Sequence, residues 1–178
     1  FSDADYARLG TRLLQNPSVK TQADQDALWS ALHDGTLNFV ATDHAPHTHE
    51  EKAQPYPKAP SGMPSIENAL ALMLDAVNHG RCTLEEIVRW TSAGPAAAWG
   101  LAGKGQIAEG FDADLVLVDL DETRTVRDSE QVTKAGWSPW DGVALTGWPV
   151  GTLVAGQRVY WCGRFDEAVR GREAVFGR

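Results

Sequence analysis

Three side chains that can bind a metal or move a proton lie close together in the string TDHAPHT: Asp43, His44 and His47. A carboxylate binds zinc through oxygen, and it can also accept the proton of metal-bound water, whose pKa falls to about 7. The spacing alone leaves a second interpretation open, in which Asp43 caps the following turn and both histidines lie in solvent. Asp43 is therefore a candidate metal ligand and general acid/base, while His44 is either its support or a packing residue.

The element that must position Asp43 is the short apolar run Leu37 to Thr42, which comes directly before it. Such a run predicts a buried parallel strand. The aspartate would then lie at the carboxyl end of the strand, where catalytic residues of α/β barrels are found.

Helix signals surround this predicted strand. Thr21 and Asp24 form a capping box ahead of an apolar stripe at helical spacing, and Gly35 is a plausible stop. After a loop, Ser65 is expected to begin a second amphipathic helix, which Gly80 ends. A third helix follows the capping box of Thr83 and Glu86, and Gly94-Pro95 is expected to break it before a short helix through Trp99.

The pattern changes after Gly100. Residues 114–119 predict a strand, and Gly156-Gln157 between two apolar runs predicts a two-residue hairpin. We therefore expect residues 1–102 to form an α/β part and residues 103–178 to form a small β-rich unit.

Composition limits the class of protein. The chain has 178 residues, 43% hydrophobic and 22% charged, which is ordinary for a soluble globular protein. A net charge of -8 argues against a nucleic-acid binder. No apolar run approaches the roughly 20 residues that span a membrane. The two cysteines, Cys82 and Cys162, are far apart and fit a reducing cytoplasm.

Beyond this local chemistry, short segments along nearly the whole chain resemble those of known enzymes. The string ATDHAPHT, followed by EEK at 50–52 and APSG at 59–62, resembles the last barrel strand and loop of bacterial dihydroorotases. Asn16-Pro17 lies where that family has Asn-Pro-Pro. Residues 105–116 resemble the return into the small β-domain of the wider amidohydrolase superfamily, and residues 137–142 and 147–150 resemble its late segment.

The resemblance implies a fold and a set of roles. The fold would be α/β: the C-terminal part of a (β/α)8 TIM-type barrel in residues 1–102, with a small β-rich (β-sandwich) domain in 103–178. Asp43 would ligate one or two zinc ions and act as general acid/base. Substrate would be bound by four residues: His47 and Asn16 at its carboxylate, and Ser61 and Gly62 through close backbone approach. Phe is frequent in the family where Ser61 stands, and Ser18 and Lys20 replace a Pro and an Arg.

Other ligands that a dinuclear site needs do not appear. There is no His-x-His pair at a predicted strand end, and His47-Thr48-His49 lies in the loop where the family does not ligate metal. The chain also opens at Phe1 in what reads as the middle of a domain. We therefore expect a fragment that binds catalytic zinc poorly and is inactive alone. Its partner would be the missing N-terminal half or, as a homodimer, a second copy.

The function implied is the reversible cyclisation of N-carbamoyl-L-aspartate to dihydroorotate in pyrimidine biosynthesis, with a small-molecule substrate. Two alternatives stay open. One is another cyclic amidase, an allantoinase or hydantoinase. The other is a non-catalytic homologue that scaffolds aspartate carbamoyltransferase.

Overall fold

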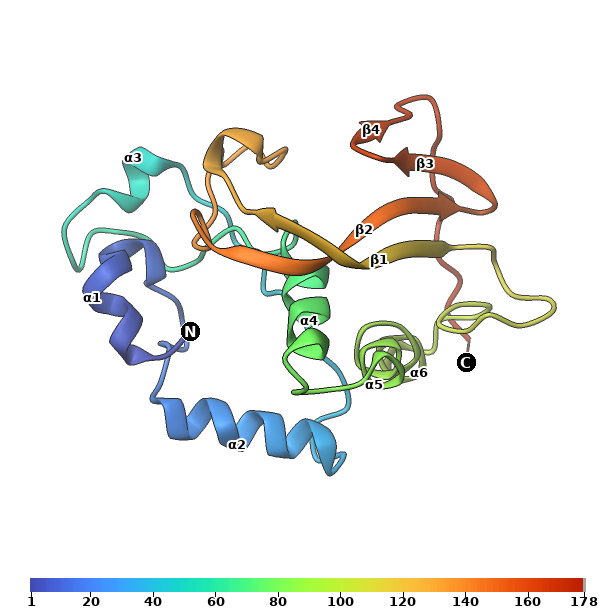
Figure 1. Ribbon diagram of the computed structural model, residues 1–178, viewed down its shortest axis with the longest axis horizontal. Coiled ribbons are helices and arrows are strands. Elements are labelled where there is room, and N and C mark those ends of the chain that lie inside the picture. Colours follow the sequence, from blue (N-terminus) through green and yellow to red (C-terminus); the bar gives the residue numbers. More distant parts are fainter. Residues whose placement is uncertain (178) are drawn as a thin grey trace. The chain divides into compact units, whose positions relative to one another are not determined.

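The computed structural model describes residues 1–177, which form several helices and one sheet (Figure 1). The chain divides into two compact units, each assembled from separate segments. Unit 1 comprises Phe1–Leu37, Ala41–Ala69 and Thr125–Ala144. Unit 2 comprises Asn38–Val40, Leu70–Arg124 and the segment that begins at Leu145. The expected division at residue 102 into parts of a larger barrel and a β-domain stays a prediction. No helix among residues 1–177 is long and apolar enough to cross a membrane.

Unit 1 consists of short helices and long loops. Its helices are the 3-10 turn Asp3–Asp5, α1 (Tyr6–Leu9), the 3-10 turn Gly10–Leu13, α2 (Gln22–His33), α3 (His49–Lys52) and the 3-10 turn Asp128–Glu130. The predicted capping box before α2 is confirmed, since Thr21 Oγ1 accepts from the backbone N–H of Asp24. The core of the unit is formed by buried Leu9, Leu13, Met63 and Trp137.

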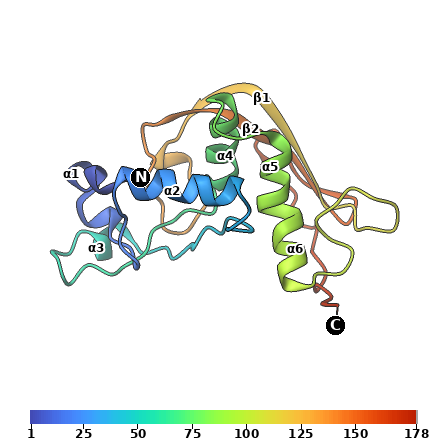
Figure 2. The same ribbon diagram turned by 90° about the horizontal axis from the view of Figure 1, so that it is seen from below.

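The helices of unit 2 depart from prediction at two places. Helix α4 (Ala69–Asn78) begins four residues later than expected, because Ser65 is engaged elsewhere in the chain and a turn follows it. Helix α5 (Leu84–Val88) has the predicted Thr83–Glu86 capping box. However, Gly94-Pro95 does not break it: a π-helical turn, Arg89–Ala93, leads without interruption into α6 (Gly94–Trp99), and Figure 2 shows the two in line.

The π-turn explains how Pro95 is tolerated. Proline lacks an N–H and its ring clashes with a carbonyl one turn earlier in a regular α-helix, and a π-bulge relieves this by shifting the hydrogen-bond pattern. Glycine is needed beside it, because a Cβ on Gly94 would stand 2.6 Å from the carbonyl oxygen of Asn38 and 2.7 Å from that of Arg89. The pair therefore marks a close crossing of the chain rather than a helix end.

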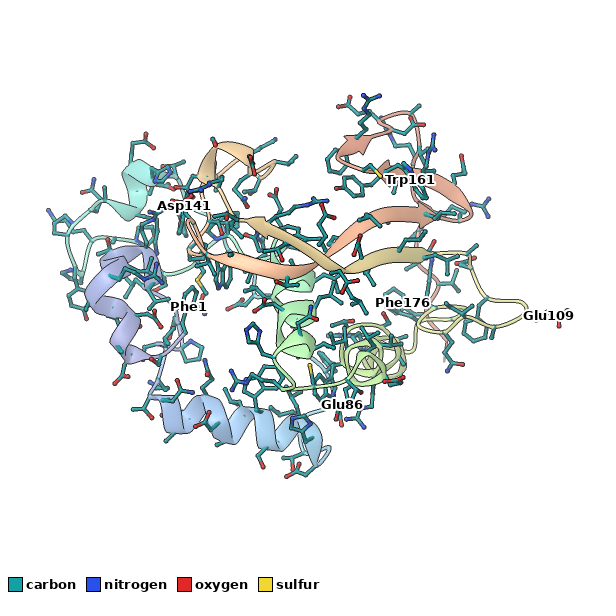
Figure 3. All side chains as sticks on the ribbon, viewed as in Figure 1. Phe1, Glu86, Glu109, Asp141, Trp161 and Phe176 are labelled. Atoms are coloured by element: carbon teal, nitrogen blue, oxygen red, sulfur yellow. The ribbon has the colours of Figure 1, made fainter. Side chains whose placement is uncertain are left out.

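Unit 2 also contains one four-stranded sheet of order β1-β2-β3-β4, with β1 Leu115–Thr125, β2 Ala144–Val154, β3 Gln157–Trp161 and β4 Arg164–Phe165. Strands β2 and β3 pair antiparallel, as do β3 and β4. The ring of Trp161, which Figure 3 labels, packs against Gly151. A side chain at position 151 would not fit, because its Cβ would lie 2.8 Å from the ring. The predicted strand at 114–119 is thus confirmed and is longer than expected.

The predicted hairpin is confirmed, although its loop is one residue earlier than expected. Ala155 and Gly156 form the turn with φ of 49° and 76°, and Gln157 already begins β3. Positive φ at both central residues is the signature of a type I′ turn, which matches the twist of the flanking strands.

The predicted buried strand Leu37 to Thr42 is wrong for this structure. Residues 38–48 are neither helix nor strand, and Leu37 is 38% exposed. A parallel strand needs a neighbouring strand to complete its hydrogen bonds, and the described residues pair no strand with this run. Instead, the Val40 N–H donates to the Trp90 carbonyl at 3.0 Å.

Candidate functional site

Asp43 has an unusual backbone conformation. Its φ is +44°, in the left-handed region that non-glycine residues seldom adopt, although aspartate tolerates it better than most. Its side chain is exposed, and no hydrogen bond or ion pair within residues 1–177 involves its carboxylate. The exposed carboxylate of Asp43 is therefore available to a ligand.

The two neighbours of Asp43 are fastened to a single turn ahead of α4. Ser65 Oγ donates to the Thr42 carbonyl at 2.7 Å. The backbone N–H groups of Ser65 and Ile66 both donate to His44 Nδ1, at 3.1 and 3.2 Å. Because Nδ1 accepts, the neutral His44 ring carries its proton on Nε2. His44 therefore holds the backbone on which Asp43 is displayed, which favours the support role over a solvated one.

The His47 ring lies between two acceptors. Its Nε2 is 3.1 Å from the Ser61 carbonyl oxygen, and its Nδ1 is 3.3 Å from Glu51 Oε2. Only a doubly protonated ring donates to both at once. The pKa of Glu51 is held below its ordinary value, first by the Thr48 backbone N–H and then by the His47 ring.

The backbone of His47 is fixed independently of its ring. Trp137, which is fully buried, donates from Nε1 to the His47 carbonyl at 2.8 Å. The guanidinium of Arg12 lies over the Trp137 ring, 4.7 Å from its centroid, and pairs with Asp128 at 3.0 Å. The segment 125–144 thus supports the loop that carries His47 from within unit 1.

Gly62 occupies a position that no side chain fits. Its φ is +122°, and a Cβ would stand 2.4 Å from the Ala45 carbonyl oxygen and 2.8 Å from the Ala45 Cβ. Its N–H donates to the Leu14 carbonyl at 2.9 Å. The structure therefore requires glycine here to pack against the Asp43 segment, whatever its contact with substrate.

Lys52 joins the same loops through its side chain. It is 1% exposed, and its ammonium donates to the carbonyls of Leu14, Pro60 and Gly62 at 3.1, 2.8 and 2.8 Å. Burial lowers the pKa of Lys52 from its usual value. The sequence does not predict that Lys52 is buried, because the run Glu50-Glu51-Lys52 has the composition of a segment exposed to solvent.

The structure thus brings four of the five predicted site residues into or beside one network of unit 1, namely Asp43, His47, Ser61 and Gly62. His47 contacts Ser61, Ser61 adjoins Gly62, and Gly62 is bonded to Leu14, two residues before the exposed Asn16. Asp43 joins the network through Ala45, two residues further along the chain, whose N–H donates to the Met63 carbonyl at 3.3 Å.

Metal ligands are not assembled to the same degree. Among residues 1–177, no three His, Cys, Asp or Glu side chains gather closely enough to hold a metal ion. The exposed carboxylate of Asp43 fits the role of one oxygen ligand. None of the five candidate residues lines the open hollow of about 450 Å³ in this unit. Its lining residues are Tyr6, Gly10, Thr11, Leu14, Ser18, Val19 and Tyr56.

Comparison with known proteins places this network in context. Residues 3–159 match the model of the Amidohydrolase family. The chain is 42% identical over 172 residues to a dihydroorotase of Halobacterium salinarum, covering 97% of this chain and 40% of that protein. It is 36% identical over 163 residues to a dihydroorotase of Bacillus subtilis, covering 91% and 38%.

Solved structures of the same kind are also similar. The L-hydantoinase (dihydropyrimidinase) of Arthrobacter aurescens superposes with a TM-score of 0.87 at 32% identity, covering 93% of this chain and 38% of that one. The dihydropyrimidinase of Brevibacillus agri gives a TM-score of 0.82 at 31% identity, covering 88% and 35%. The chain thus spans about two fifths of the length of the relatives it matches.

Proposed function

The chain belongs to the amidohydrolase family, and from that membership we propose that it forms part of a zinc-dependent dihydroorotase. The reaction is the reversible cyclisation of N-carbamoyl-L-aspartate to dihydroorotate. The observation that carries the proposal is the network of unit 1, in which the loop of residues 61–63 bonds to the His47 ring at Ser61 and to the Asp43 segment through Met63 and Ala45. The dihydroorotase names of the curated relatives support this substrate over others.

In the direction of ring opening, Asp43 accepts the proton of the attacking water and delivers it to the leaving ring nitrogen. Its exposed, unengaged carboxylate suits both the proton transfer and ligation of metal through oxygen. One or two zinc ions, when bound, would lower the pKa of the attacking water and polarise the amide carbonyl.

His47 and Asn16 are proposed to hold the substrate carboxylate. The His47 ring already faces the Ser61 carbonyl and Glu51, so a substrate carboxylate would replace one of these acceptors. Gly62 has both its N–H and its carbonyl engaged within the protein, so its contribution is close approach rather than a hydrogen bond. Ser61, which is exposed, is left to contact the substrate.

The finer architecture is proposed on the same basis. Residues 1–102 would belong to a (β/α)8 barrel and residues 103–178 to a β-sandwich domain, completed by an N-terminal half that supplies the remaining metal ligands. The isolated chain would then bind zinc poorly and be inactive, and would associate with that half or with a second copy. We place the complete protein in the cytoplasm.

Substrate profiling of the complete protein tests the function. We expect turnover of dihydroorotate and none of hydantoin or allantoin. A hydantoinase is the second candidate, because several of the similar solved structures carry that name. Hydantoin turnover without dihydroorotate turnover would replace our proposal with it. Absence of any turnover, with no bound zinc, would favour the non-catalytic scaffold of aspartate carbamoyltransferase.

A further inference from the structure

The buried ammonium of Lys52 has a geometry that the proposed chemistry does not use. The residue ends helix α3, five positions after His47, and its side chain is 1% exposed. Its partners are three backbone carbonyls, at Leu14, Pro60 and Gly62, within 3.1 Å. These carbonyls come from two loops that are distant in sequence, one leading to Asn16 and the other flanking Ser61.

The match between donors and acceptors is complete. An ammonium has three N–H donors, and each has one carbonyl here. Burying a charge is costly unless hydrogen bonds satisfy it, so the arrangement holds only while both loops keep their places. Since charge-assisted hydrogen bonds are about twice as strong as neutral ones, the ammonium binds the loops more firmly than a neutral donor would.

The same geometry excludes a direct role in proton transfer. All three protons of Lys52 point at backbone oxygens, and the side chain is closed to solvent. The bond from the Gly62 N–H to the Leu14 carbonyl runs beside these contacts and joins the same two loops.

We propose that Lys52 is a positioning residue whose ammonium fixes the distance between the loop of Asn16 and the loop of Ser61 and Gly62, and thereby sets the affinity for the substrate carboxylate. The proposal rests on the proposed function of these loops. It gives the lysine of the Glu50-Glu51-Lys52 run a role in substrate recognition without contact to the substrate.

The test compares Lys52→Met with Lys58→Met in the complete protein. Lys58 lies on the exposed part of the same loop, so its variant removes the same charge without touching the three carbonyls. For Lys52→Met we expect KM for dihydroorotate to rise about tenfold or more, as loss of hydrogen bonds to a charged group implies. We expect kcat and zinc content to change less than about threefold, because the residues on either side of Asp43 are held by Ser65 and Ile66 and not by Lys52. Lys58→Met should match the parent.

A second variant covers the case in which Lys52→Met does not fold. Arginine keeps the charge, but its planar fork cannot present three donors in the arrangement of an ammonium. Lys52→Arg should therefore still raise KM and speed amide hydrogen exchange in residues 12–18 and 59–64, measured without substrate. If every Lys52 variant that folds keeps KM within twofold and the parent's exchange rates, the proposal is overturned.

The exchange measurement separates this proposal from the proposed function. A parent protein that does not turn over dihydroorotate would defeat the function alone, while faster exchange in the two loops would still support the joining role of Lys52. Normal turnover by the parent, together with unchanged KM and exchange in the variants, would defeat the role of Lys52 alone.

Discussion

The histidine loop of unit 1, residues 41–69, and the sheet of unit 2 are held in place by different kinds of hydrogen bond. The sheet is held by backbone ladders, such as the pairing of Gly151 with Trp161 and of Val154 with Gln157. The histidine loop contains a single short helix, and the side chains of Lys52, Ser65 and Trp137 hold it by donating to backbone carbonyls.

The two kinds of hydrogen bond make the sheet and the loop respond differently to substitution of their side chains. A ladder tolerates most side chains that suit a strand, because its bonds come from the backbone. A loop held by named side chains loses its shape when one of them changes, but it can display residues such as Asp43 in conformations that a ladder forbids. Substitutions in the loop should therefore have larger effects than matched substitutions in the sheet.

Replacement of Asp43 by Asn in the complete protein should lower kcat by about 10²–10⁴-fold, because it removes the proton acceptor and a charge at the metal. The control is Asp119→Asn on β1, where the carboxylate accepts from the N–H groups of Asp121 and Glu122 and an amide oxygen can do the same. Steady-state assays decide, and an Asp43→Asn enzyme within tenfold of the parent would remove Asp43 from the mechanism.

Replacement of His47 by Ala should raise KM for dihydroorotate about tenfold or more, since a donor to a charged group is lost. The zinc content should be unchanged, because His47 faces Ser61 and Glu51 rather than a cluster of ligands. Elemental analysis together with kinetics tests this. A variant that loses one zinc per subunit would make His47 a ligand and end its role in carboxylate binding.

Replacement of Gly62 by Ala should destabilise unit 1 by about 1–3 kcal/mol from backbone strain alone, with the overlap against Ala45 adding to this. Gly156→Ala is the matched variant in the sheet. It also has positive φ, but the nearest atom to its new Cβ is 3.8 Å away. Chemical denaturation of both variants measures the difference, and equal losses would mean that the histidine loop yields as readily as the hairpin.

The sequence predicted those features whose physical cause is local. The capping boxes at Thr21 and Thr83 depend on a residue three positions away, and both are present. The hairpin near Gly156 depends on two positive φ angles and was found within one residue. The resemblance, and not local physics, singled out Asp43, His47, Ser61 and Gly62 as site residues. Their roles in catalysis and substrate binding remain predictions.

The features that the sequence did not predict depend on distant partners. Leu37 to Thr42 has the composition of a strand, yet no neighbouring strand is present among the described residues to pair with it. Ser65 looks like a helix cap, but it donates to Thr42 instead. Lys52 looks like a surface charge, and only the positions of Leu14 and Pro60 bury it. A glutamate-rich run that ends in a buried lysine has no local signature.

The smallest effect is expected at the tip of the β2–β3 hairpin, where Ala155 is not the residue type that the turn favours. Ala155 has φ of +49°, which costs a non-glycine residue about 1–2 kcal/mol, and asparagine tolerates this region better. The preferred pair for a type I′ turn is Asn-Gly, and Gly156 already supplies the second residue. The backbone N–H of Ala155 donates to the side chain of Asp114, at Oδ1, over 2.7 Å, and a change of the residue 155 side chain leaves this donor in place. Ala155→Asn should therefore stabilise the hairpin by roughly 0.5–1 kcal/mol.

Slower hydrogen exchange at the Gly156 amide, which is bonded to the Ala113 carbonyl, would report the gain. Turnover and exchange in residues 41–69 should not change, and a change in either would mean that the hairpin and the histidine loop are coupled.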